Sequence, residues 1–339
     1  MTRHRVDLAL LAVAVVWGSS YLAAKEVVGA DSVLSFLAVR FAMAAGVLAL
    51  VLKRRIARVG RDELIAGSSF GAILTAICVC ETYGVTMTSA SNAGLIMALT
   101  VVITPLVGGR GAAAPLFYAP AALVVLGCIA LTQSGGFALP GAGDVLIVGA
   151  AVLRAVHVIL ISRVSAQRRL DPAAVTLVQL GTVAALTAMP AGALGQFSAV
   201  ALMSGRDWAL TAYLALACTV FAFGVQIWAV RYSTPARMSL LLGTEPLWAV
   251  VVGVGLAGDP VTALGALGAA LVLIGTNWGR IVDSATISDT RRRPPGTEAA
   301  GNAIERVLIS RGAGSQPCRG TSRRLHRRSR WCSRRSRRA

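Results

Sequence analysis

Ten long apolar stretches, separated by short polar segments, occupy the first 283 residues of the chain. We place them at 7–25, 33–52, 64–82, 92–109, 116–134, 144–162, 173–193, 208–229, 238–257 and 262–281. Each is close to the roughly 20 residues with which a helix crosses the hydrocarbon core of a bilayer. Barrel strands would instead alternate polar and apolar residues, and lipid admits only helices or closed barrels. The pattern therefore predicts an all-α membrane protein with ten transmembrane helices.

Composition agrees with a lipid environment and separates a basic tail from the apolar body. Charged residues make up 14% of the chain, against about a quarter in soluble domains, and the mean hydropathy is +0.69. The net charge of +18 is concentrated in residues 284–339, which contain 15 Arg and only three acidic residues. Such a segment buries too little apolar surface to fold, so we expect a disordered cytoplasmic tail.

The distribution of basic residues between loops predicts the orientation in the membrane. If the loops alternate between the two sides, one side carries 13 Lys and Arg, and the other carries only Lys25 and Arg206. Basic residues accumulate on the cytoplasmic side. We therefore expect a multi-pass protein of the cytoplasmic membrane with both termini in the cytoplasm, which requires an even number of helices.

Two halves of the chain show the same spacing of helix-perturbing residues. Pro105 and Pro246 are 141 positions apart, and so are Gly127 and Gly268. Five helices per half is an odd number, so the second copy would enter the membrane inverted, as in many transporters with a central site. The predicted divisions are a first five-helix repeat (1–136), a second five-helix repeat (137–283) and the tail (284–339).

Several short motifs resemble those of the EamA-like family of the drug/metabolite transporter superfamily, over roughly residues 6–282. They are Trp17-Gly18-Ser19-Ser20-Tyr21 with Lys25, Phe36-Leu37-Ala38-Val39-Arg40-Phe41, Thr88-Ser89-Ala90-Ser91-Asn92-Ala93-Gly94, Glu245-Pro246, and the small residues from Gly265 to Gly275. The Gly-Glu pair common in that family is replaced by Gly109-Arg110 and Gly258-Asp259. The resemblance implies a ten-helix fold and export or exchange of a small metabolite or drug, and the family spans several substrate classes.

Glu245 is the strongest candidate for a functional residue. It lies in a predicted span directly before Pro246, which lacks the N–H needed to continue a regular helix. A carboxylate beside a loosened turn can bind a cationic group or carry a proton. The alternative is a structural carboxyl bonded to a neighbouring helix, because a charge inside a span is costly and is usually paired with another group.

Arg154 and His157 are three residues apart and share one helix face. Arg154 is suited to binding a substrate carboxylate, or to pairing with Glu245 or Glu81. His157 is suited to proton coupling, or to packing through a hydrogen bond. Arg40 lies near a predicted helix end, as Glu81 does, where a charge reaches the interface at little cost. We therefore interpret both as interface groups, with a ligand role as the less favoured alternative for Arg40.

The remaining candidates are an amide and three aromatic side chains. Trp17, Tyr21 and Trp248 would line a cavity, or would occupy belt and core positions. Asn92 would line a cavity or cap the helix that follows it.

The sequence gives little support to other classes of function. Gly67-Ser68-Ser69-Phe70-Gly71 fits a hydrolase motif, with His157 as an intramembrane base, but the motif requires a strand–turn–helix and fits helix packing equally well. No cysteine spacing suggests a metal and no loop suggests a phosphate, so we expect no cofactor and no enzyme. A non-transporting scaffold or receptor is the main alternative to a secondary transporter working by alternating access.

The expected partners are a small-molecule solute and the lipid bilayer, with a second copy of the chain as a further candidate. For the tail, contact with anionic lipid, or no role at all, is favoured over nucleic-acid binding.

The predicted topology is tested by reporter fusions along the chain. Fusions after Arg61, Arg169 and Arg280 should report the cytoplasm, whereas fusions after Asp31 and Gly141 should report the opposite side, because basic loops stay cytoplasmic. Paired cytoplasmic and periplasmic reporters at each position provide the measurement and its control. One reversed position between two correct ones would contradict the ten-helix map.

Overall fold

The structure is a computed structural model that describes residues 3–53, 59–108, 118–132, 141–168, 170–229, 232, 238 and 241–292. All regular elements in these residues are helical. The chain forms two compact units, Met1–Ser288 and Asp289–Ala339. Most of the predicted tail lies outside the described residues.

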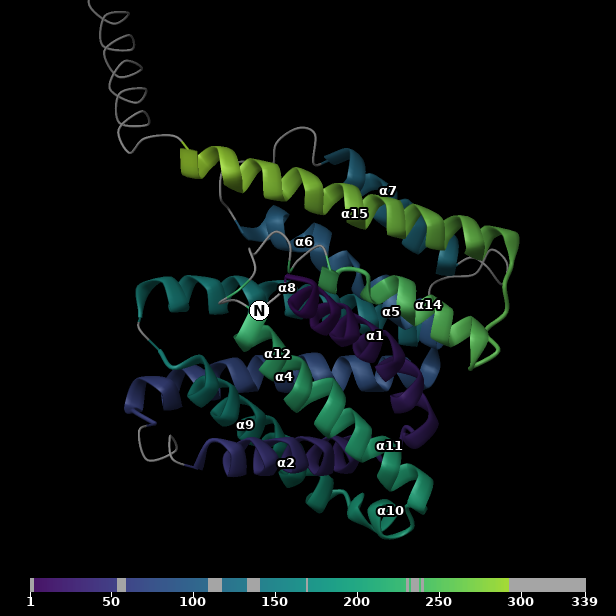
Figure 1. Ribbon diagram of the computed structural model, residues 1–339. Helices are drawn as coiled ribbons and strands as arrows, with labels where there is room; N and C mark the ends of the chain where they lie inside the picture. The colour runs from purple at the N-terminus through teal and green to yellow at the C-terminus, as the bar shows by residue number, and fades with distance from the viewer. Residues whose placement is uncertain are drawn as a thin grey trace, which may run out of the picture. The chain divides into compact units, whose positions relative to one another are not determined.

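The helices cover nearly all of the described chain (Figure 1). They are α1 Arg3–Val27, α2 Val33–Val51, α4 Arg61–Met87, α5 Ala90–Met97, α6 Leu99–Gly108, α7 Tyr118–Thr132, α8 Ala142–Gln167, α9 Pro172–Ala193, α10 Phe197–Ala201, α11 Gly205–Ala215, the π-helix η2 Leu216–Phe221, α12 Ala222–Ala229, α14 Glu245–Gly255 and α15 Ala263–Arg292.

Each predicted apolar stretch coincides with helix in the structure, but not every one reaches spanning length. Six helices are long and apolar enough to cross a membrane: His4–Val27, Val33–Val51, Arg61–Met87, Ala142–Ser165, Pro172–Ala193 and Gly205–Gln226. Four shorter apolar helices occupy the other predicted spans: Ala90–Thr104, Tyr118–Ala130, Glu245–Gly255 and Ala263–Gly279. The all-helical membrane fold is confirmed, whereas the count of ten spans rests on these shorter helices.

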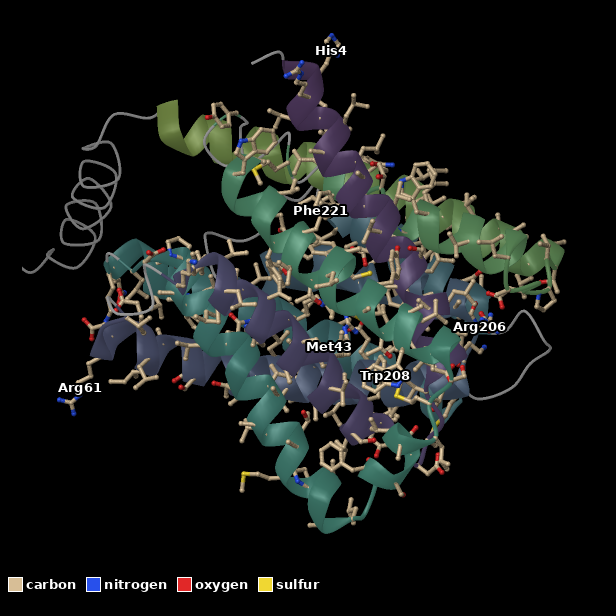
Figure 2. The ribbon with its side chains drawn as sticks, turned by 60° about the horizontal axis from the view of Figure 1, so that its bottom comes forward. His4, Met43, Arg61, Arg206, Trp208 and Phe221 are labelled. Carbon is tan, nitrogen blue, oxygen red and sulfur yellow. The ribbon has the colours of Figure 1, made fainter. Side chains whose placement is uncertain are left out.

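Outward-facing side chains on several helices are apolar, as a lipid-facing surface requires. Leu126 of α7 is 55% exposed and Met189 of α9 is 73% exposed, although both are large hydrophobic residues. In the side-chain view of Figure 2, His4 and Arg61 project away from the helices, and Met43 lies among them. Exposed apolar surface on this scale is uncommon on a soluble monomer.

The two halves interlace instead of forming separate bodies. The most extensive helix contacts join α2 to α9, α4 to α8 and α9, α14 to α1 and α5, and α6 to α8, so each joins one half of the chain to the other. These contacts define two mixed groups of helices, which we call group A (α2, α4, α8, α9) and group B (α1, α5, α14). The helix predicted at 92–109 breaks at Ala98, so that α5 packs in group B and α6 packs on α8 of group A.

Glycines allow the closest approaches within each group. In group A, a Cβ on Gly67 would lie 2.6 Å from the Cβ of Val178, and one on Gly71 would lie 2.5 Å from the Cβ of Thr182. In group B, Gly94 faces the Ala249 side chain. Small residues at a helix crossing let backbones approach closely, which is how helices associate in lipid. The Gly67–Gly71 segment thus has the packing role that the sequence offered as one alternative.

We expect Gly94→Ala to lower stability, because the added methyl would overlap the Ala249 side chain. Overpacking of this kind costs about 1–3 kcal/mol. The matched control is Gly149→Ala on α8, where no atom lies within 4 Å of the new Cβ and helix propensity improves. Thermal unfolding of the purified proteins in detergent measures the difference. Equal midpoints for the two variants would show that the α5–α14 contact is not tight.

Candidate functional site

A partly buried ion pair joins α4 to α8. The Arg154 Nη2 lies 2.7 Å from the Glu81 Oε2, and both side chains are largely shielded from solvent. Because α4 continues to Met87, Glu81 lies six residues, or roughly 9 Å, before its end. The interpretation of Glu81 as an interface group was therefore wrong. Of the partners offered for Arg154, Glu81 is the one in direct contact.

Glu245 begins α14 and is bonded to α1. The Tyr21 hydroxyl donates to Glu245 Oε1 over 2.9 Å. Pro246 follows in the first turn, where a missing N–H costs nothing, so the expected mid-helix break is instead a helix start after Gly243 and Thr244. In the other half the break falls at Ala98, well before Pro105. The two prolines therefore do not mark equivalent broken turns.

Close backbone contacts fix the place of Glu245. A Cβ on Gly18 of α1 would lie 2.6 Å from the Trp248 Cβ and 2.9 Å from the Glu245 carbonyl oxygen. At the other end of α14, Asp259 Oδ2 accepts a hydrogen bond of 2.9 Å from the Ser91 backbone N–H at the start of α5. The acid of the Gly258-Asp259 pair therefore ties α14 to α5, and Gly258 makes the turn with a φ of +70°.

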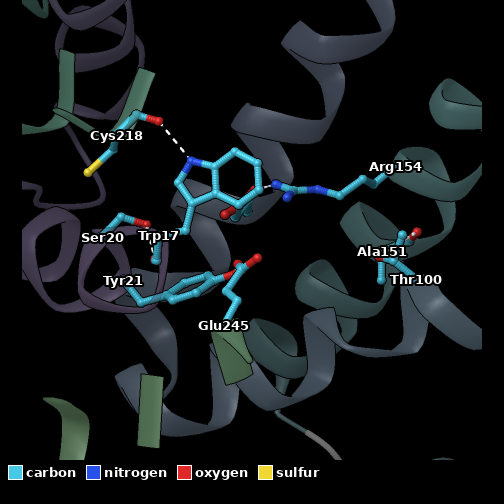
Figure 3. Close-up of polar contacts among 9 residues, drawn as sticks. Trp17, Ser20, Tyr21, Thr100, Ala151, Arg154, Cys218 and Glu245 are labelled. Atoms are coloured by element: carbon cyan, nitrogen blue, oxygen red, sulfur yellow. Dashed lines mark hydrogen bonds and ion pairs between the residues drawn. The ribbon is translucent and has the colours of Figure 1, made fainter. Parts of the chain in front are cut away.

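Trp17 is hydrogen-bonded to a distant part of the chain, whereas Trp248 is hydrogen-bonded to a residue one turn before it. The Trp17 Nε1 donates to the Cys218 carbonyl oxygen in η2 over 2.9 Å, whereas the Trp248 Nε1 donates to Thr244 Oγ1 of its own helix over 3.2 Å. The π-helix changes the backbone pattern here, as is frequent at functional sites. Figure 3 shows Trp17, Tyr21, Glu245 and Arg154 around one space.

The charges of this cluster act on one another. Arg154 lies within electrostatic range of Glu81, Glu245 and Tyr21, so one guanidinium faces two carboxyl groups. Glu81 and Arg154 belong to group A, and Tyr21 and Glu245 belong to group B. The attraction between Arg154 and Glu245 therefore acts between the two groups of helices.

His157 and Asn92 have local roles in the structure. His157 is buried, its ring meets Phe70 edge-on, and its Nε2 lies 3.2 Å from Gln179 Nε2. Since an amide nitrogen only donates, the Nε2 of His157 accepts, as a packing histidine would. The capping interpretation of Asn92 was wrong, because the cap is Ser89, whose Oγ accepts from the Asn92 backbone N–H.

Arg40 was also misplaced by the sequence interpretation. It is the eighth residue of α2, its guanidinium lies over the Phe41 ring at 5.3 Å, and its Nε is buried. A cation in a span costs about 2.5–3.5 kcal/mol on insertion scales, and a cation–π contact recovers part of that cost. Counting residues from Val33, where α2 begins, places Arg40 inside the bundle instead of at an interface.

Membrane-length apolar helices around buried charges define a polytopic integral membrane protein with a polar interior. The model of the EamA-like transporter family matches residues 4–109 and 141–278, as two repeats. The chain belongs to this family. One solved structure, titled only "Crystal structure of protein", is similar with a TM-score of 0.55 and 17% identity, covering 83% of this chain and 98% of its own. No curated protein matches the chain.

The Glu81–Arg154 pair predicts a strong asymmetry between single and double substitutions. Glu81→Leu should destabilise the protein by about 3–5 kcal/mol, because Arg154 would stay buried without a partner. Glu81→Leu combined with Arg154→Met should recover most of that loss. Unfolding of the purified variants in detergent provides the measurement.

The control is the exposed pair between Arg168 Nη1 and Asp62 Oδ1, at 3.0 Å. Arg168→Ala should cost less than about 1 kcal/mol. A Glu81→Leu protein as stable as the Arg168→Ala control would show that Arg154 does not depend on Glu81.

Proposed function

We propose that this protein is a secondary transporter that exports or exchanges a small metabolite or drug across the cytoplasmic membrane by alternating access. Its site would comprise Trp17, Tyr21, Glu81, Arg154 and Glu245. The observation that carries the proposal is the convergence of two buried polar contacts, Tyr21–Glu245 and Glu81–Arg154, each joining the two repeats. Ionisable residues within transmembrane segments are rare and are by default candidates for a solute or ion pathway.

The relation between the repeats supports a central site. Gly127 and Gly268, which the sequence relates by 141 positions, lie against each other: a Cβ on Gly127 would be 2.7 Å from the Gly268 carbonyl oxygen. Residues next to a twofold axis meet their own counterparts in this way. Inverted repeats place substrate near such an axis, where broken helices leave polar groups available.

Glu245 is the group that we expect to carry a proton. Three titratable side chains act on it or on its neighbours: Tyr21 from α1, Arg154 from α8 and Glu81 from α4. Protonation of Glu245 would weaken its attraction to Arg154 and so loosen group A from group B. A proton would thereby change the relative stability of two arrangements of the helices, which is what coupling requires.

The contacts that the structure describes for Ser69 and His157 add no support to the hydrolase alternative. Ser69 Oγ donates to the Ile65 carbonyl oxygen over 2.8 Å in its own helix, and His157 contacts Gln179 and Phe70. The cytoplasmic position of both termini, a lipid contact of the tail and a homodimer stay predictions.

We expect Glu245→Gln to reach the membrane in normal amounts and to transport poorly, with a weaker dependence on pH, because the amide keeps the Tyr21 hydrogen bond but cannot titrate. Metabolite profiling of cells and medium, with and without the gene, first identifies the solute, and its flux is then measured for each variant.

The matched control is Glu26→Gln, which removes a carboxylate from an exposed pair with Arg206 and should leave flux unchanged. Normal transport by Glu245→Gln, or its failure to accumulate, would make Glu245 a packing residue. Identical metabolite profiles with and without the gene would favour the scaffold alternative.

A further inference from the structure

Arg40 differs from the other charged side chains inside the helices. Arg154 is paired with Glu81, and Glu245 accepts from Tyr21. The Arg40 Nε is buried, and no residue in the described part of the chain accepts a hydrogen bond from it. A buried donor without a partner is costly, so its persistence calls for a partner that comes from outside the chain.

The neighbours of Arg40 place it in the interior. It acts electrostatically on Cys78 of α4 and on Cys218 of η2, and α2 contacts both of these elements. Near Cys218, Ser19 Oγ and Tyr213 Oη lie 2.6 Å apart. These groups are all uncharged, and Glu81, an acid of α4 well inside the helix, already pairs with Arg154. The positive charge of Arg40 thus faces polar groups that do not neutralise it.

We infer that Arg40 binds the carboxylate of the transported solute, so that the substrate is a carboxylate-bearing molecule. This inference rests on the proposed function. A guanidinium presents a planar fork of donors that matches a carboxylate with two parallel hydrogen bonds. The indole of Trp17, bonded to Cys218, offers an apolar surface to the rest of the molecule.

A phosphate headgroup of a lipid has the same charge, but Arg40 is poorly placed to meet one. Seven residues, or roughly 10 Å of helix, separate it from Val33 at the start of α2. The groups on which it acts electrostatically belong to α4 and η2, two elements that α2 packs against. A solute that enters the bundle reaches this position more readily than a headgroup in the membrane plane.

The test measures binding without transport. The purified full-length protein in detergent, in chloride-free buffer, is titrated with acetate, phenylacetate and succinate, and with the matching amides as uncharged controls. A ligand that binds only the folded state raises the unfolding temperature. We expect at least one carboxylate to raise it and its amide to have no effect. Arg40→Gln should abolish the shift, and Arg40→Lys should weaken the apparent affinity roughly tenfold, because the charge stays and the fork is lost.

Arg61→Gln, at the exposed start of α4, is the matched control and should keep the full response. The inference is overturned if no carboxylate shifts the folded protein, if an amide acts equally, or if Arg40→Gln responds fully. If Arg40→Gln does not fold, the test rests on Arg40→Lys, and an apparent carboxylate affinity of Arg40→Lys equal to that of the unmodified protein overturns the inference.

Loss of the response on adding phosphatidylglycerol would assign Arg40 to a lipid headgroup. If the protein binds carboxylates but transports no solute, the proposed function is contradicted and this inference is not. If it transports an uncharged solute, this inference is contradicted and the proposed function is not.

Discussion

The Arg154 guanidinium can stay among the membrane helices only because the Glu81 carboxylate lies 2.7 Å away. Desolvation of a charge is among the largest costs that a protein can meet, and in the low dielectric of the interior a close partner is what offsets it. The pair forms where α4 and α8 pack closely against each other. The closest contacts around it, Gly84 of α4 against Ile147 and Gly143 of α8, supply that proximity. Much of the position of group A follows from this requirement.

Group B is held by a different interaction, which is backbone contact at glycine. Gly18 and Gly94 bring α1 and α5 against the same short helix, α14. Lipid supplies no hydrophobic drive between helices, so close van der Waals contact and a few hydrogen bonds provide the stability. Because α14 starts at Glu245, the contact that fixes the helix also fixes the carboxylate beside Tyr21. Packing and the polar site are thus set by the same residues.

The sequence predicted the existence and type of the helices well, because an apolar run of spanning length has few alternatives in lipid. It predicted partners poorly. Glu81 and Arg154 are 73 positions apart, and nothing local says that α4 and α8 meet. A proline in the first turn of a helix and one in its middle have the same local pattern, so Pro246 was misinterpreted. An error of five residues at the end of α4 was enough to move Glu81 from the interior to an interface.

The interlaced repeats constrain how such a protein can alternate between two open states. Each of groups A and B contains helices of both repeats, so the repeats cannot move as two blocks without breaking the glycine contacts inside each group. Tightly packed contacts tolerate little deformation, and motion follows the boundaries between packed units. Arg154 of group A lies within electrostatic range of Glu245 of group B. In the proposed mechanism the moving units would therefore be groups A and B, defined by their contacts, and not the two sequence repeats.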